Sequence, residues 1–196
     1  MRRVAIISLN SSRSTGGVER VVSIHQQILS KAGYDVRIFS MPVINFKKQT
    51  IFSKLIYKIS LVVFPVFSSI WARAWSGMDG KVFSHGYSSI GLFCDVVFAH
   101  GCWEAFRKSN NLPRTAFGRL AFLYEKLAGL NTKKIVAVSD AVKNDWIKYY
   151  NAEASKIYIL YNCVEQKIFF PNNRHELRDA DDHAIFRVLF VGRLEN

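Results

Sequence analysis

The sequence has few cysteines, and they form neither a metal-binding nor a disulfide pattern. Cys94, Cys102 and Cys163 are odd in number and include no C-x-x-C pair, so neither a disulfide framework nor a zinc knuckle is indicated. A reducing compartment fits this usage best, and we expect the protein in the cytoplasm. The apolar run in MRRVAIISLN is too short for the core of a signal peptide, so residues 4–9 are expected to form a strand.

Several common ligand-binding and catalytic signatures are also missing. Neither G-x-G-x-x-G nor G-x-x-x-x-G-K-[ST] occurs, which argues against a dinucleotide site and a P-loop. Without G-x-S-x-G there is little support for a nucleophilic hydrolase. No helix-turn-helix, RRM or zinc-finger signature is present, so nucleic acid is only a minor alternative as a partner. Because neither His85 nor His100 has a metal-ligand spacing around it, no metal cofactor is expected.

Acidic residues are scarce, and none occurs between residues 36 and 78. The chain has 27 Lys and Arg against 15 Asp and Glu, a formal net charge of +12. Such a balance favours an anionic partner, and nucleic acid, anionic lipid headgroups and sugar nucleotides all meet that description. The hydrophobic content of 49% is enough for a folded core.

The acid-free segment contains a predicted basic amphipathic helix. Its apolar face comprises Phe52, Leu55, Ile56, Ile59, Val62, Val63 and Val66, and the expected membrane-surface residues are Lys47, Lys48, Lys54 and Lys58. Such a helix can lie in a membrane interface, here the inner face of the cytoplasmic membrane. The uncharged stretch from Ile59 to Ala72 contains Pro65 and has 14 residues, fewer than the ~20 that a spanning helix needs. The alternative is a pair of core helices with a solvated basic side.

Strand-like and helix-like segments alternate along the chain. Residues 4–9, 18–33 and 34–41 predict a strand, a helix ending at Gly33, and a second strand, which together form a βαβ unit of the Rossmann kind. Further strands are predicted at 81–89, 95–103, 134–139 and 156–162. Further helices are predicted at 115–130 and at 140–150, the second with Ser139 as its N-cap. The sequence therefore predicts an α/β fold, a Rossmann-like doubly wound parallel sheet. This domain is expected to span residues 1–170, followed by a polar linker at 171–185 and the first strand of another domain at 186–196.

Two features are candidates for a ligand site. Gly16 and Gly17 precede a predicted helix, whose N-terminal N–H groups and dipole favour an anion, although a plain tight turn explains the pair as well. His85 and His100 each follow an apolar strand, at the edge where open α/β sheets bind ligands. Trp103 and Glu104, next to His100, could form an acceptor pocket, and a structural role for these residues is the alternative.

Five stretches of the sequence carry a resemblance to a known family. They are GGVERVV with the following AGYDVRIFS, then DVVFAHG, IVAVSDAVKNDW, LYNCVEQKIFFP and VLFVGRLEN. In this order they resemble the N-terminal, acceptor-side domain of glycosyltransferase family 4, whose members have the GT-B fold of two facing Rossmann-like domains. The last stretch resembles the opening of the second, donor-binding domain. Cys163 departs from the family pattern, which has Gly at that position.

The resemblance implies retaining transfer of a sugar from a nucleotide sugar to an acceptor hydroxyl, with no bound metal. Gly16, Gly17 and Arg193 are expected to stabilise the charge on the leaving diphosphate. His100 is the expected catalytic residue, orienting groups near the sugar and the acceptor. Substrate-binding roles are expected for Trp103, Glu104 and Ser139. The acceptor is expected to be an envelope polymer, such as a lipid-linked glycan or lipopolysaccharide core.

The resemblance also implies that this chain holds only half of a site. Family members bind the nucleotide sugar mainly through a Lys shortly after GRL and an E-x7-E segment, and neither is present. Whether the 196 residues are an enzyme by themselves is left open, and we expect no turnover without a separate chain that carries the donor domain. The alternative from another class is a non-catalytic Rossmann-like module that docks on membranes or on a partner.

Overall fold

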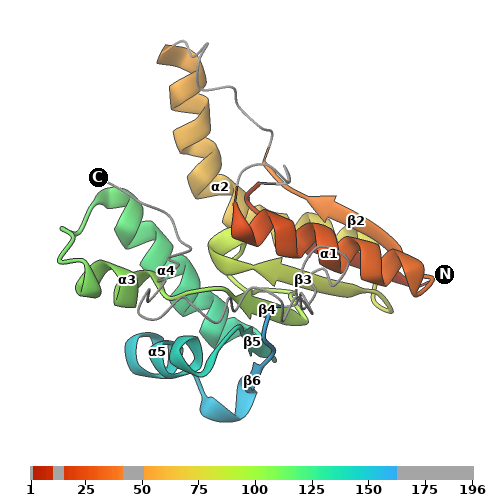
Figure 1. Ribbon diagram of the computed structural model, residues 1–196. Coiled ribbons are helices and arrows are strands. Elements are labelled where there is room, and N and C mark those ends of the chain that lie inside the picture. The colour runs from red at the N-terminus through yellow and green to blue at the C-terminus, as the bar shows by residue number, and fades with distance from the viewer. Residues whose placement is uncertain (1, 11–15, 42–50, 163–196) are drawn as a thin grey trace, which may run out of the picture. The chain divides into compact units, whose positions relative to one another are not determined.

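The structure, a computed structural model, describes residues 2–10, 16–41 and 51–162, with side chains from residue 55 onward in the last range. Six parallel strands form one sheet in the order β2-β1-β3-β4-β5-β6 (Figure 1). The strands are β1 (Arg3–Ile7), β2 (Asp35–Phe39), β3 (Lys81–His85), β4 (Val96–Ala99), β5 (Ile135–Ala137) and β6 (Ile157–Ile159). The predicted Rossmann-like parallel sheet is therefore confirmed for this part of the chain.

Five helices are described between the strands. They are α1 (Gly17–Lys31), α2 (Ile51–Ser76), α3 (Trp103–Ser109), α4 (Ala116–Asn131) and α5 (Asp140–Tyr150), with short 3-10 turns η2 (Gly86–Ser88) and η3 (Ala154–Lys156). The two predicted caps are confirmed: Gly33 has φ +85° just past α1, and the Ser139 hydroxyl accepts the Val142 N–H at the start of α5. The predicted linker and final strand lie outside the described residues.

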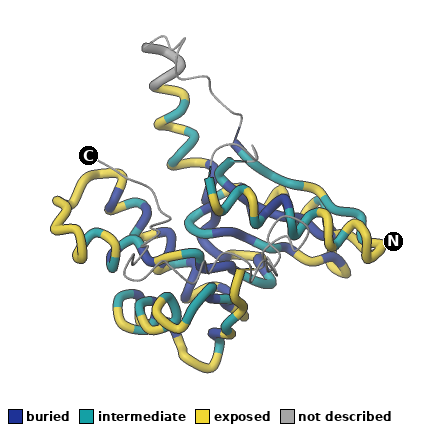
Figure 2. The backbone as a smooth tube through the Cα atoms, viewed as in Figure 1, coloured by how far each residue is buried: buried dark blue, intermediate teal, exposed yellow. Residues whose placement is uncertain are grey.

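The apolar strands are buried on both faces, as a parallel sheet requires. In β1 the side chains of Val4 and Ile6 pack with Val22 of α1 on one face, whereas Ala5 and Ile7 point into the larger core on the other. That larger core includes apolar residues of α2, α4 and α5, among them Ala72, Ala128 and Trp146. Figure 2 shows the resulting band of buried residues through the sheet.

The acid-free segment differs from the predicted pair of core helices. Within it, Ile51–Ser76 is a single helix, α2, which continues through Pro65. From residue 64 onward α2 has fully buried positions, including Ser68 and Ala72, but none of residues 55–63 is buried. Figure 1 shows this first half standing away from the sheet. By length and composition alone Leu55–Ser76 could cross a membrane, although buried core helices pass the same test.

Gly91, in the β3–β4 connection, is required by both its conformation and its surroundings. Its φ is +77°, and a Cβ there would lie 2.8 Å from the backbone of Ala128 in α4. Gly33 has a similar φ of +85° but has open space around it. A side chain at Gly33 would meet only the strain of a left-handed backbone, whereas a side chain at Gly91 would also collide with α4. Substitutions at the two glycines therefore measure these two effects separately.

We predict that Gly91→Ala destabilises the protein more than Gly33→Ala. Gly33→Ala is the matched control, and it should lower the free energy of unfolding by about 1 kcal/mol through the backbone conformation alone. Gly91→Ala should lower it by a further ~1–3 kcal/mol, because the added Cβ overpacks against α4. Urea unfolding followed by circular dichroism measures both. Equal losses would show that α4 does not approach the β3–β4 connection as closely as described.

Candidate active site

The carboxyl ends of neighbouring parallel strands place two histidines side by side. His85 is the last residue of β3 and pairs in register with Phe98 of β4, and His100 follows β4 directly. Their rings stack with centroids 5.1 Å apart, and His85 Nδ1 lies 2.8 Å from His100 Nε2, a hydrogen-bond distance. The repeated strand-His-Gly pattern in the sequence thus corresponds to one histidine pair at the ligand-binding edge of the sheet.

Aromatic rings and a third histidine surround this pair. The Phe98 ring is stacked on His85 at 4.7 Å, and His25 of α1 lies 5.3 Å from His85 and 4.8 Å from Phe98, measured between ring centroids. Sequence reasoning did not single out His25. The signal was nevertheless present, because His25 occupies the apolar stripe of α1 at helical spacing from Val18, Val22 and Leu29.

The histidines are held in their neutral form. Burial, and to a lesser extent His25, lowers the pKa of His100 to about 4. Burial also lowers the pKa of His85 well below its usual value, and neighbouring His100 and His25 add to this effect. At pH 7 the pair can therefore donate and accept hydrogen bonds, but it does not supply a positive charge.

The backbone that follows His100 is fixed by residues from α4 and α5. The indole of buried Trp146 donates to the Gly101 carbonyl at 2.8 Å. The backbone N–H of Trp103, at the start of α3, donates to a carboxylate oxygen of Glu125 at 2.9 Å, and the Tyr150 hydroxyl donates to the same oxygen. These bonds satisfy donors and acceptors that the turn from β4 into α3 would otherwise leave unpaired.

Glu125 was not expected from the sequence, where it reads as an ordinary acidic residue of a helix. Burial raises its pKa to about 7, although the bonds from Tyr150 and Trp103 favour the charged form. The carboxyl group therefore changes its charge near neutral pH directly beneath the loop that carries His100 and Gly101. No local sequence pattern marks this residue, since its partners come from distant elements.

The structure places Trp103 and Glu104 in packing and ionic contacts. The Glu104 carboxylate is buried and bound by Arg107 at 2.7 and 2.9 Å and by Arg114 at 3.3 Å. These contacts, with Arg107 the strongest, lower its pKa to about 2. The Trp103 ring lies edge-on to Phe117 at a centroid distance of 5.7 Å. An acceptor-binding role for either residue stays a prediction.

The predicted diphosphate-binding glycines lie at the start of α1. Gly16 immediately precedes the helix, Gly17 opens it, and Gly17 has open space around its Cα. The Glu19 carboxylate lies close to Gly16 and also accepts a bond from Asn10 at 3.3 Å. An incoming anion would therefore meet open backbone at Gly17 and a carboxylate beside Gly16.

The other predicted site residues are distributed over two regions. The Ser139 hydroxyl follows β5 at the same sheet edge and caps α5, accepting from the Val142 N–H at 3.2 Å. Lys58 is exposed on α2, away from the histidine pair along the chain. Lys54 lies in α2 without a described side chain, and Lys47, Lys48 and Arg193 lie outside the described residues.

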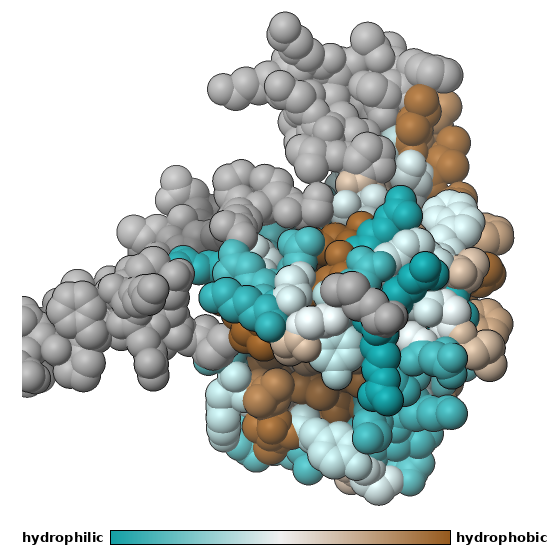
Figure 3. Space-filling view, turned by 90° about the vertical axis from the view of Figure 1, so that its right-hand side faces the viewer, coloured by the Kyte–Doolittle hydropathy of each residue, from teal (hydrophilic) through white to brown (hydrophobic). Residues whose placement is uncertain are grey.

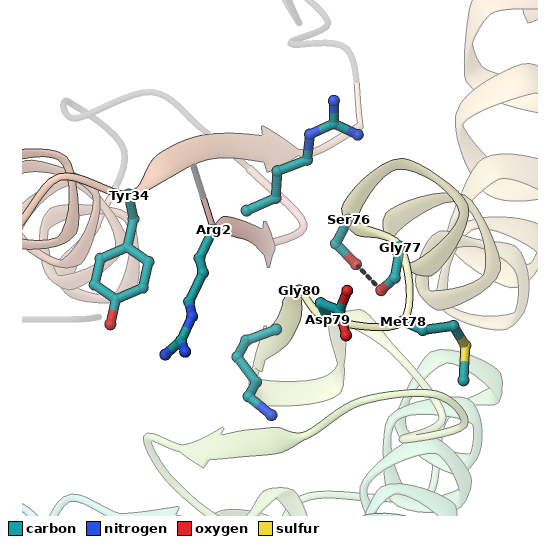
Figure 4. A pocket seen from close by; sticks show the side chains of 9 residues that line it. Arg2, Tyr34, Ser76, Gly77, Met78, Asp79 and Gly80 are labelled. Carbon is teal, nitrogen blue, oxygen red and sulfur yellow. Dashed lines mark hydrogen bonds between the residues drawn. The ribbon is translucent and has the colours of Figure 1, made fainter.

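Two hollows differ in their relation to the histidine pair. One of about 880 Å³ lies at the amino ends of β1 and β3, between Arg2 and Tyr34 on one side and the turn containing Asp79 on the other (Figure 4). That edge is opposite to the one that carries the histidines. The second, of about 580 Å³, begins at Gly101 and Cys102, directly after His100, and extends between α3 and α5.

No metal centre emerges at this edge. Across residues 2–10, 16–41 and 51–162, no group of three or more His, Cys, Asp or Glu side chains is placed to hold a metal ion. Within the His25, His85 and His100 cluster, His85 Nδ1 and His100 Nε2 lie at hydrogen-bond distance.

Comparison with known proteins identifies the class of the domain that carries the pair. Residues 82–167, from β3 to beyond β6, match the family model described as Glycosyltransferase Family 4. This match supports a domain of the glycosyltransferase family 4 type over this region and, in general terms, a role in glycosyl transfer. The matched range contains His85, His100 and Glu125. The search of curated proteins gave no match.

We predict that the stability of wild type relative to Glu125→Gln falls as pH rises from 4.5 toward 7, whereas the buried histidines give both proteins a slope of the opposite sign. Because the pKa of Glu125 is about 7 in the folded protein and 4.5 ordinarily, the unfolded chain loses its proton first as pH rises. The protonated carboxyl therefore makes its whole contribution to the free energy of unfolding below pH 4.5. This contribution is lost as pH rises toward 7, and the loss is about 3 kcal/mol at most. Urea unfolding between pH 4.5 and 8 measures the slope.

The exposed Glu153 supplies the matched control. Its pKa is lowered by Ser155 and Lys156, so Glu153→Gln should leave the slope above pH 5 unchanged. Wild type and Glu125→Gln with parallel stability curves over this range would contradict the assignment of Glu125 as a buried group that titrates near neutrality.

Proposed function

We propose that this chain forms the acceptor-side half of a retaining glycosyltransferase. The complete enzyme would move a sugar from a nucleotide sugar to an envelope glycan or a lipid-linked acceptor. The observation that carries the proposal is the histidine pair His85 and His100, which lies at the ligand-binding edge of the sheet and inside the range that matches the family.

In the proposed reaction the bond between the anomeric carbon and the diphosphate oxygen breaks. The acceptor oxygen bonds to the same face of that carbon, and its proton leaves with the diphosphate. Since His100 is neutral at pH 7, it would orient the sugar and the acceptor through hydrogen bonds and would not supply a counter-charge. A neutral imidazole at this edge suits a positioning role better than a covalent one.

The negative charge that develops on the diphosphate needs other groups. The free backbone N–H groups at the start of α1, at Gly17 and the residues after it, and the dipole of this 15-residue helix are suited to that task. Arg193 belongs to the stretch that resembles the opening of the donor-binding domain, and it would place a positive charge near the diphosphate. Both walls of such a site must be positioned within about an ångström.

The non-catalytic module remains the second candidate, and the exposed apolar half of α2 favours it. A module of that kind would need the fold and the exposed surface but not the chemistry of His100. The two proposals therefore differ in the consequence of changing one imidazole.

We predict that deleting the gene in its source organism shortens an envelope glycan by one sugar. Wild-type protein should restore that sugar, and His100→Asn should not, because Asn cannot reproduce the bond to His85 and the ring stacking. Mass spectrometry of the released glycans measures the outcome, with protein level and circular dichroism confirming that the variant is folded. Lys133→Gln, an exposed change elsewhere, is the matched control.

Each outcome separates the candidates. Full restoration by His100→Asn would favour the non-catalytic module and contradict the catalytic role of His100. An unchanged glycan profile after deletion would contradict the proposed function itself.

A further inference from the structure

The first half of α2 exposes apolar side chains that a soluble core would bury. The exposed large residues on this helix are Leu55, Ile56, Ile59, Val62, Val63, Phe67, Ile70 and Trp71, each between 39% and 53% exposed. At 100° per residue they all fall on about one half of the helix circumference. In Figure 3 hydrophobic side chains gather at the upper right, at the height of the projecting part of α2 in Figure 1.

The opposite side of α2 packs against the protein. Phe64, Ser68, Ser69 and Ala72 are buried, the Ser68 hydroxyl donates to the Ser88 carbonyl at 3.0 Å, and the Tyr124 hydroxyl donates to the Val62 carbonyl at 3.0 Å. Only 28% of Leu55–Ser76 is buried. The helix is therefore anchored along one side while its apolar side faces solvent, which is unusual for an exposed patch of this length.

Charge on and around this surface has one sign. No Asp or Glu occurs from residue 36 to residue 78, and Lys58 is exposed beside the apolar face. Arg73 is tied to Asp95 at 2.7 Å at the far end of the helix. An apolar face beside the exposed Lys58, in a segment without acidic residues and a chain of net charge +12, is complementary to a lipid surface that carries negative headgroups.

The geometry points to α2 as a helix that lies in the interface of an anionic membrane, and we propose this as the docking surface of the protein. Spanning is disfavoured because the Ser68, Ser69 and Ala72 side is bound to the rest of the fold and lipid cannot surround it. Phe67 and Trp71, stacked at a centroid distance of 6.2 Å on the exposed side, suit the headgroup level.

This surface lies toward the edge that carries the histidine pair. Because α2 follows β2 and leads back to β3, its first residues lie at the carboxyl end of the sheet. A lipid-anchored acceptor in the bound membrane would therefore approach the edge of His85 and His100. The docking itself does not depend on the proposed glycosyl transfer, and the two can fail separately.

The test is co-sedimentation of the purified chain with vesicles of phosphatidylcholine alone and with one third phosphatidylglycerol. We expect binding to the anionic vesicles that weakens as salt is raised. Leu55→Ser with Ile59→Ser should lower the partition coefficient about tenfold or more, and Lys58→Gln should lower it about fivefold on anionic vesicles only. Leu123→Ser with Leu130→Ser, exposed apolar residues of α4, is the matched control and should bind as wild type.

A second readout locates the helix relative to the bilayer. Brominated lipids should quench tryptophan fluorescence, and Trp71→Phe should remove most of that quenching. Absence of binding, or equal binding by the Leu55/Ile59 double variant and wild type, would overturn the proposal. Binding that resists alkaline carbonate extraction would indicate a spanning helix instead. If the chain does not bind vesicles and the double variant has a lower sedimentation coefficient than wild type, the apolar face is covered by a second copy of this chain.

Discussion

The hydrogen bond between His85 and His100 depends on the parallel pairing of β3 with β4, and the candidate site depends on that bond. His85 pairs with Phe98, two residues before His100, so both imidazoles lie on the same side of the sheet and both His-Gly pairs leave it at one edge. Burial by Phe98 and His25 then keeps the imidazoles neutral. A different register would place the rings apart, because a one-residue shift reverses the side to which each side chain points.

The pair is supported by a second, polar layer that carries a stability cost. Glu125 and Tyr150 are buried together and bind the start of α3, and Trp146 holds Gly101. A carboxyl whose pKa is raised by burial costs folding free energy whenever it is ionised. Such a network specifies the loop position that apolar packing alone would leave open.

The sequence predicted the fold closely because its signals are local. Continuous apolar strands, the Gly33 stop and the Ser139 cap each depend on neighbouring residues, and all three are found as expected. The histidine edge was also predictable, from two strands with the same ending. His25, Glu125 and Arg107 were not, because their roles arise where separate elements meet. The acid-free segment was predicted as basic and amphipathic, but its continuity through Pro65 depends on packing against α4 and η2.

The neutral histidine pair and the start of α2 both lie toward the carboxyl edge of the sheet. The most direct measurement of the central claim is an NMR titration of the histidine rings, with ¹⁵N-labelled histidine, from pH 8 to pH 4. The account predicts that His85 and His100 each carry one ring proton from pH 8 down to about pH 5 and that His100 has its titration midpoint near pH 4. An imidazolium at His100 with an ordinary pKa near 6.5 would contradict it, because a buried, hydrogen-bonded pair could not then be the basis of the site.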